Sequence, residues 1–192
     1  MKIHQPAESI EDASVALQML KDGNERYLKG EFIQKKNYNA DREAFTGAQK
    51  PFSAILTCSD SRVAPEIIFD QKLGDLFIVR NAGNIACKTA LGSLEYAIEY
   101  LNVKLIVVCG HSNCGAVAAA YESSKNEFPV NIKEIISHIK PAIEKGGDIN
   151  NIAHNNIENM VNKIKTDEII IKPDILVVGA FYNIHSGIVD WL

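Results

Sequence analysis

The sequence predicts an α/β fold in which a mostly parallel central sheet is flanked by helices. Four short apolar segments rich in Ile, Leu and Val have the length and composition of buried strands: 53–58, 75–80, 105–109 and 175–180. Helical patterns alternate with them, at 64–70, 89–101, 113–123, 132–143 and 149–165. Buried strands that alternate with helices are typical of a parallel sheet covered on both faces.

The two ends of the chain add a helical extension and an edge element. Ser9 and Asp12 mark the start of an amphipathic helix that extends to about residue 29. Residues 30–50 are polar and aromatic without a period, so we expect a loop there with room for a short helix. The tail from Tyr182 to Leu192 carries His-Ser-Gly between two apolar runs, which predicts an edge strand or hairpin. We therefore expect one domain, 1–192, with an N-terminal helical arm (1–50) and an α/β core (51–192).

Composition excludes several classes of protein. The chain has 192 residues, 46% hydrophobic and 23% charged, which is typical of one globular domain with a sizeable core. A net charge of −4 gives no basic surface for nucleic acid or for an anionic membrane. No apolar run approaches the roughly 18 residues of a membrane helix, and the first residues lack the apolar core of a signal peptide. We expect a cytoplasmic protein, whose four cysteines are better suited to metal binding or catalysis than to disulfides.

Residue types that bind metals follow two of the predicted strands. Cys58 ends the first strand, and the segment after residue 109 contains His111 and Cys114. Ligand sites of open α/β sheets lie beyond the carboxyl ends of the strands. Two cysteines and one histidine leave a fourth tetrahedral position open, which is the arrangement of catalytic zinc. We expect Cys114 in the first turn of the next helix, where the helix dipole favours a thiolate. Each motif alone is weak, because a single cysteine at a strand end is usually a small core residue.

Asp60 and Arg62 follow Cys58 closely and can form a bidentate ion pair. The simplest alternative is a solvated surface pair of little consequence. Two thiolates would neutralise the charge of zinc and acidify a bound water less than three histidines do. A carboxylate that accepts a proton from this water would help to orient and ionise it. Asp60 could instead occupy the fourth position itself.

The remaining cysteines and histidines lack such spacing. Cys109 lies within a buried strand and is expected to be an inert core residue, whereas Cys87 lies in a loop and could start a helix. Gly110 and Gly115 bracket the His111–Cys114 turn and are expected to serve its backbone geometry. Four histidines are expected at the surface: His4, His138, His154 and His185. The chain contains no glycine-rich phosphate-binding pattern.

These motifs together resemble the β-class carbonic anhydrases. Cys-Ser-Asp-Ser-Arg-Val at 58–63 and His-Ser-Asn-Cys-Gly at 111–115 carry the resemblance. Gly-Asp-Leu-Phe-Ile-Val-Arg-Asn-Ala-Gly-Asn at 74–84 is similar to the second strand of that family and its following loop. Residues 178–182, with Gly187, are similar to its last strands. The resemblance extends over nearly the whole chain.

The resemblance implies reversible hydration of CO₂ to bicarbonate and a proton, through a zinc-bound hydroxide. One zinc ion per subunit would be bound by Cys58, His111 and Cys114. Asp60 and Arg62 would form the catalytic pair of the family.

The resemblance also implies a substrate pocket and self-association as a dimer or tetramer. Gln49 matches the amide that binds substrate or bicarbonate, and the backbone amide near Gly115 would orient a bound anion. Phe77, Ala82 and Tyr96 match residues of the apolar CO₂ pocket, several of which come from the neighbouring subunit in that family. Without the resemblance, ordinary core packing would be the better interpretation of the two aromatic residues.

One position departs from the pattern of some members. These hold bicarbonate at an inhibitory site with a tryptophan three residues before the first cysteine ligand, where this chain has Ile55. Arg80 and Tyr182 match the other residues of that site. We therefore predict that steep inactivation by bicarbonate at low pH is absent.

Three other functions remain compatible with the sequence. A hydrolase of carbonyl sulfide or carbon disulfide would keep the same ligands and differ in its pocket. A non-catalytic zinc-binding protein would have no use for Gln49, Asp60 and Arg62 together. A thiol redox protein is disfavoured because the chain has no C-x-x-C motif.

Overall fold

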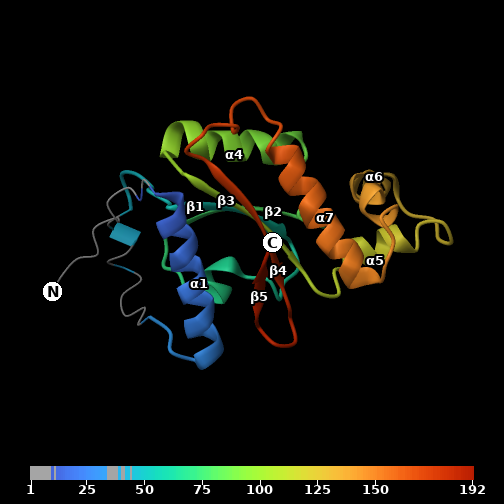
Figure 1. Ribbon diagram of the computed structural model, residues 1–192, viewed down its shortest axis with the longest axis horizontal. Helices are drawn as coiled ribbons and strands as arrows, with labels where there is room; N and C mark the ends of the chain where they lie inside the picture. The colour runs from blue at the N-terminus through green and yellow to red at the C-terminus, as the bar shows by residue number, and fades with distance from the viewer. Residues whose placement is uncertain (1–9, 11, 34–38, 40–41, 44) are drawn as a thin grey trace.

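The computed structural model describes residues 10, 12–33, 39, 42–43 and 45–192. Within these ranges it contains one five-stranded sheet (Figure 1). The strands are β1 (Ser53–Cys58), β2 (Leu76–Asn81), β3 (Leu105–His111), β4 (Leu176–Tyr182) and β5 (Val189–Trp191). Their order is β2-β1-β3-β4-β5, with all pairs parallel except the antiparallel pair of β4 and β5. The predicted parallel sheet and C-terminal hairpin are confirmed.

Helices with well-described bounds are arranged around this sheet. They are α1 (Ala13–Lys29), α3 (Pro65–Ile68), α4 (Lys88–Leu101), α5 (Gly115–Tyr121), α6 (Val130–Ile143) and α7 (Ile149–Ile164). Residues of α4, α5, α6 and α7 form the core on one face of the sheet, and residues of α1 and α3 pack on the other. Figure 1 shows α4 along the top, α1 at the left, and α5 with α6 as a lobe at the right. None of the helices in the described ranges is long and apolar enough to cross a membrane.

The two central strands are buried on both faces, as their continuous apolar sequences predict. Every residue of β1 and β3 is buried. Alternate side chains enter different cores: Ala54 and Leu56 face α4 and α7, whereas Ile55 lies in the core beneath α1. Each fully buried Leu or Ile stabilises the fold by about 1.5–3 kcal/mol. The strands therefore hold the loops at their carboxyl ends on a rigid base.

Several predicted boundaries were wrong by one or two residues. The first helix begins after Asp12, whose carboxylate accepts a hydrogen bond from the Ser14 amide at 2.8 Å; the alternative start, Ser9, lies outside the described residues. The strand predicted to end at residue 109 continues to His111 because the β3–β4 ladder continues to this residue. The helix predicted to begin at residue 113 starts at Gly115, because Asn113 has a φ of 54°, which is not helical.

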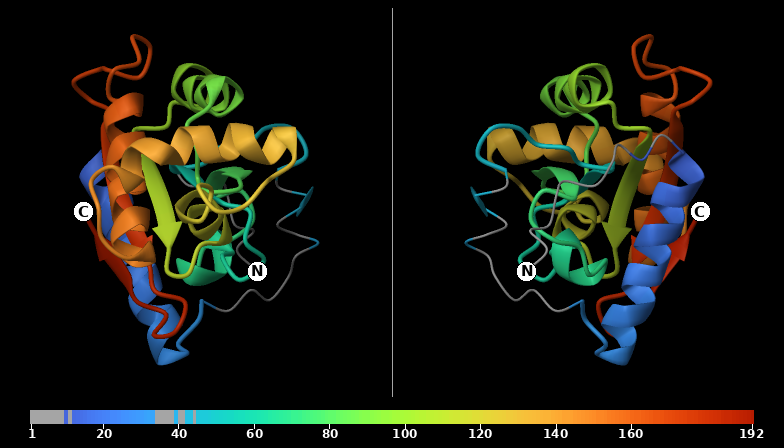
Figure 2. Two further views of the ribbon diagram at one scale, coloured as in Figure 1. Left: turned by 90° about the vertical axis from the view of Figure 1, so that its right-hand side faces the viewer. Right: turned by 90° about the vertical axis from the view of Figure 1, so that its left-hand side faces the viewer.

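Helix α1 approaches the core unusually closely at one glycine. A Cβ atom on Gly23 would lie 1.8 Å from the carbonyl oxygen of Phe69. The adjacent Asn24 donates to the carbonyls of Ile68 (3.2 Å) and Gly187 (3.0 Å) and so fastens the helix to the turn before β5. Figure 2 shows this turn beside the C-terminal half of α1. The glycine and the asparagine together fix the N-terminal helix against the sheet.

The close contact predicts opposite effects for two Gly→Ala substitutions within helices. Gly23→Ala should destabilise the protein by about 3 kcal/mol or more, because the backbone of Phe69 must move. Gly92→Ala, in α4, meets no atom within 4 Å and should stabilise the protein by about 0.5–1 kcal/mol through helix propensity. Urea denaturation at matched metal content measures both, and equal effects of the two variants would contradict the packing described here.

Candidate metal centre

Three buried side chains from two strand ends meet at one edge of the sheet. Cys58 is the last residue of β1, and His111 is the last residue of the neighbouring strand β3. Cys114 lies three residues later, as the N-cap of α5. The two sulfur atoms and a ring nitrogen of His111 all lie within 4.8 Å of one another. The sequence-predicted ligand set is therefore gathered in space, although Cys114 precedes the first helical turn instead of lying in it.

The geometry of this cluster fits a tetrahedral zinc ion. Two sulfur ligands at about 2.3 Å from zinc lie about 3.8 Å apart, and the Sγ atoms of Cys58 and Cys114 are separated by 4.0 Å. The Nδ1 atom of His111 donates to the Ser112 carbonyl at 2.9 Å, which leaves Nε2 as the ligand atom. This Nε2 is buried and has no hydrogen-bond partner among the described residues.

The side chains of Cys58 and Cys114 shift each other's pKa in opposite directions. A hydrogen bond from the Cys114 thiol lowers the pKa of Cys58. Burial raises this pKa, whereas hydrogen bonds from His111 and from the Gly83 amide lower it further. The same interaction with Cys58, together with burial, raises the pKa of Cys114. The two side chains therefore do not titrate independently, and a divalent metal that binds both sulfur atoms as thiolates would displace their protons.

Asp60 lies beside the cluster and is held by Arg62. The Arg62 Nε and Nη2 atoms donate to the two carboxylate oxygens at 2.9 and 2.8 Å, and the Arg62 amide donates at 3.0 Å. The hydrogen bond from the guanidinium holds the pKa of Asp60 well below its usual range. Its Oδ2 lies 3.9 Å from His111 Nε2. The pair is thus a feature of the site, with the carboxylate ionised and turned toward arginine.

Arg80 braces the loop that carries this pair. Its Nε donates to the Cys58 carbonyl at 3.1 Å and its Nη2 to the Asp60 carbonyl at 2.8 Å. The other two positions compared with the inhibitory bicarbonate site are Ile55, which stands in place of the tryptophan, and Tyr182, which matches. Ile55 is fully buried, and the Tyr182 hydroxyl lies 3.1 Å from that of Tyr27. Burial is the main cause that raises the pKa of Tyr182. The absence of bicarbonate inactivation stays a prediction.

The residues expected around the substrate are divided between two places. Ala82, in the loop after β2, and Gly115, the first residue of α5, lie next to the cluster, but Phe77 pairs with Ala54. Phe77 of β2 therefore lies level with Ala54, which is four residues before Cys58 in β1 and about 13 Å from it along the strand. Tyr96 accompanies Phe77, with ring centroids 6.2 Å apart.

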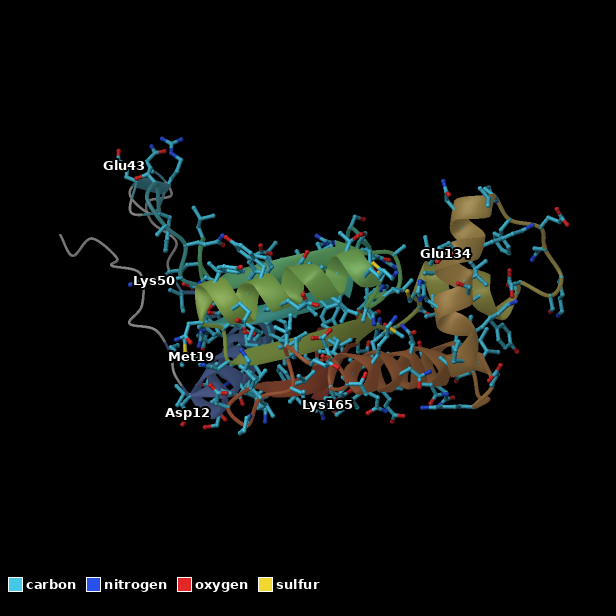
Figure 3. All side chains as sticks on the ribbon, turned by 90° about the horizontal axis from the view of Figure 1, so that it is seen from above. Asp12, Met19, Glu43, Lys50, Glu134 and Lys165 are labelled. Atoms are coloured by element: carbon cyan, nitrogen blue, oxygen red, sulfur yellow. The ribbon has the colours of Figure 1, made fainter. Side chains whose placement is uncertain are left out.

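Gln49 also lies away from the ligand cluster. It is exposed and lines a recess with Pro51 and Tyr100, before the start of β1. Figure 3 shows its neighbour Lys50 at the opposite end of the molecule from Glu134 of α6. Within one chain, the structure does not bring Gln49, Phe77 and Tyr96 to the cluster.

The remaining cysteines and histidines differ in part from expectation. Cys109 is buried in the core and Cys87 is the N-cap of α4, as predicted. His185 is exposed, but His154 stacks on Phe181 with centroids 3.9 Å apart. Half-buried His138 lies 3.4 Å from the Glu134 carboxylate; His4 is outside the described residues. His154, which was expected at the surface, is therefore half-buried against Phe181 of β4.

Two residues far from Cys58 in the sequence, which the sequence analysis did not identify, are linked to its sulfur by hydrogen bonds. The Gly83 amide donates to the Cys58 sulfur at 3.4 Å, and Asn156 of α7 donates to the Gly83 carbonyl at 2.9 Å. The Asn-Ala-Gly-Asn segment at 81–84 indicated a turn, which is the only signal in the sequence for the first contact. Nothing in the sequence around Asn156 indicates the second.

Comparison with known proteins assigns the fold and the cluster to a family. Residues 53–189 match the family model described as "Carbonic anhydrase". The solved β-carbonic anhydrase CcaA has a similar fold, with a TM-score of 0.71, 26% sequence identity, and coverage of 92% of this chain and 98% of that chain. The chain belongs to the β-carbonic anhydrase family. Enzymes of this family contain a metal, and the cluster of Cys58, His111 and Cys114 could hold it.

Two bacterial relatives show how far the similarity extends. A carbonic anhydrase of Mycolicibacterium smegmatis is 43% identical over 133 residues, which cover 68% of this chain and 65% of that protein. This chain therefore spans slightly less than two thirds of that relative. A carbonic anhydrase of Helicobacter pylori is 27% identical over 192 residues, covering 85% of this chain and 87% of that protein.

The cluster predicts that two buried cysteines differ in their importance for metal. Cys58→Ser should lower zinc affinity by more than the ~10–100-fold that loss of an outer-shell partner costs, because serine supplies no thiolate. Cys109→Ser, on the opposite face of the sheet, should retain the zinc content of the wild type. Elemental analysis after dialysis measures both. Full zinc retention by the Cys58 variant would refute the ligand assignment.

Proposed function

We propose that this protein is a zinc-dependent carbonic anhydrase that interconverts CO₂ with bicarbonate and a proton. The observation that carries the proposal is the ionised Asp60–Arg62 pair beside a cluster in which the described residues supply three ligands. A structural zinc site is closed by four protein ligands, whereas three leave a position for a small molecule. Membership of the β-carbonic anhydrase family supports the same reaction.

The cluster residues have complementary roles in this proposal. When bound, zinc supplies a Lewis acid that lowers the pKa of a water. Cys58 and Cys114 bind it as thiolates, and His111 binds through Nε2 while the Ser112 carbonyl fixes its ring. Because two thiolates would balance the dipositive charge, the site would depend on a neighbouring carboxylate that accepts a hydrogen bond from the water and so eases its ionisation, the proton passing to buffer.

Asp60 is the residue that we assign to this task. Its ionised carboxylate accepts a hydrogen bond from the reacting water and so directs a lone pair of the water oxygen at the carbon of CO₂. Arg62 occupies both carboxylate oxygens and thereby holds Asp60 out of the ligand set. The backbone amide near Gly115 is the group that we expect to orient the product anion.

The alternative substrates share this ligand set and are distinguished by direct assay. Stopped-flow measurement of CO₂ hydration, run beside assays with carbonyl sulfide and carbon disulfide on zinc-assayed protein, tests the proposal. We expect CO₂ to be the preferred substrate. Zinc-loaded protein that hydrates no CO₂ would refute the proposal, in favour of sulfur substrates or of a non-catalytic zinc protein.

We also propose that the enzyme acts in the cytoplasm as a dimer or a larger assembly. Tyr96, one of the residues matched to the CO₂ pocket, is 45% exposed, and its ring stacks at 5.1 Å on that of Tyr100, which is 76% exposed. They flank β2, an edge strand of the sheet. An exposed aromatic patch beside an open strand edge favours association with a second copy. Such a copy could carry Gln49, Phe77 and Tyr96 to the metal centre of its partner.

The role of Asp60 predicts a loss of rate without a loss of metal. Asp60→Asn should retain zinc and lower kcat/KM by on the order of 10²-fold or more, because a neutral amide oxygen is a weaker hydrogen-bond acceptor for the reacting water than a carboxylate. Asp190→Asn, at an exposed position of β5, is the matched control and should leave the rate unchanged. Since the pKa of Asp60 is depressed, its carboxylate stays charged as pH rises from 5 to 8. The wild-type rate should therefore show no titration of Asp60 in that window.

Sharing of residues between subunits predicts complementation of two inactive variants. Cys58→Ser lacks the metal ligand, and Gln49→Ala lacks the amide expected in the neighbouring site. Random assortment into dimers makes half of the dimers mixed, and one of the two sites in each is intact, so about a quarter of the sites recover. Activity measured after co-refolding tests this. A mixture no more active than its components would place Gln49 outside the partner's site.

A further inference from the structure

The loop between β2 and α4 is held in one conformation next to the metal centre. The Asn81 side chain bridges the loop by donating to the Ile85 carbonyl at 2.8 Å and accepting from the Ile85 amide at 2.7 Å. Gly83 has a φ of 81°, and a Cβ on it would lie 2.9 Å from Ile139 and 3.2 Å from Ala116. Both the backbone conformation and the lack of space require glycine at this position.

Gly83 is hydrogen-bonded through both of its backbone groups. Its amide donates to the Cys58 sulfur at 3.4 Å, and its carbonyl accepts from Asn156 Nδ2 at 2.9 Å. Asn156 is 1% exposed and lies in α7, 73 residues further along the chain. A continuous path of hydrogen bonds therefore runs from helix α7, through one glycine, to a cysteine of the cluster.

Helix α7 is a firm support for this path. Its N-terminus is closed by a capping box between Asp148 and Asn151, and its residues Ile152 and Ile157 are fully buried beneath the sheet. The Oδ1 atom of Asn156 has no partner among the described residues, so the bond to Gly83 is the one that the structure assigns to its side chain. The side-chain nitrogen of Asn156 therefore has one assigned contact, the Gly83 carbonyl.

We propose that Asn156 is a positioning residue for the cysteine ligand Cys58 and acts on it through Gly83. An N–H donor aimed at a thiolate fixes the direction of the sulfur lone pairs and stabilises its charge. Without Asn156 the buried Gly83 carbonyl would lack its partner, which favours a shift of the loop toward other donors. The amide would then leave the sulfur. This inference rests on the proposed metal site, which it deepens by a contribution from the C-terminal helix.

The test compares two buried asparagines with the same chemistry. Asn156→Leu removes the amide at similar volume, and Asn156→Asp keeps the size but replaces the donor with an acceptor. Asn24→Leu is the matched control, because Asn24 also donates from a buried position to backbone carbonyls but lies on α1. Zinc release to a chelator, the thiolate-to-metal absorption of the cobalt-substituted protein, and hydrogen exchange of the Gly83 amide in the metal-free protein are measured for each.

A positioning role predicts a specific pattern of results. Both Asn156 variants should release zinc about 10–100-fold faster, the loss typical of an outer-shell partner. Both should also alter the cobalt absorption and accelerate Gly83 exchange. Asn24→Leu should lower stability but leave these three readouts at wild-type values. Equal changes in the two sets of variants, or no change in either, would overturn the inference.

Two results separate this inference from the proposed function. Wild-type protein that binds neither zinc nor cobalt would refute the proposed function. If the wild type binds metal and the Asn156 variants match it in all three readouts, the positioning role alone is refuted. The wild type also offers a test that needs no variant. Slow exchange of the Gly83 amide in the metal-free protein supports the path, and exchange as fast as in an exposed loop would contradict it.

Discussion

The parallel pairing of β1 with β3 is the constraint on which the metal centre depends. Thr57 lies opposite Cys109 in this ladder, so that Cys58 and His111 leave the sheet at the same edge. A slip of one residue would turn the Cys58 side chain to the other face and separate the two ligands. Burial of both strands on both faces sets the register, because a slip would exchange the residues that fill two different cores.

The electrostatics of the site follow from how the loop after Cys58 is held. Arg62 neutralises the Asp60 carboxylate, while Arg80 binds the carbonyls of Cys58 and Asp60 and fixes the backbone between them. The guanidinium groups of Arg62 and Arg80 thus both contact the segment that follows Cys58. A buried thiolate is costly unless donors surround it, and the Gly83 amide and the Cys114 thiol provide such donors to Cys58.

The described chain presents a complete ligand set but a divided substrate pocket. The ligands lie at the carboxyl ends of the strands, whereas Phe77 and Tyr96 lie beside the amino end of β1 and are accompanied by the exposed Tyr100. Phe77 and Tyr96, which the resemblance assigns to the substrate pocket, therefore do not lie beside the ligands within one chain. The candidate metal cluster, by contrast, depends on the fold of one chain.

The sequence by itself determined the parallel sheet, because β1 and β3 carry continuous apolar runs that only a doubly covered sheet can bury. It also determined the ligand types and the Asp60–Arg62 pair, since these are local to two strand ends. Tertiary structure decided the rest. The extension of β3 to His111 depends on its ladder with β4, the place of Phe77 depends on strand register, and the contact of Asn156 with Gly83 spans 73 residues. Such contacts leave no periodicity or motif in the chain, because they arise only when separate helices and strands pack together.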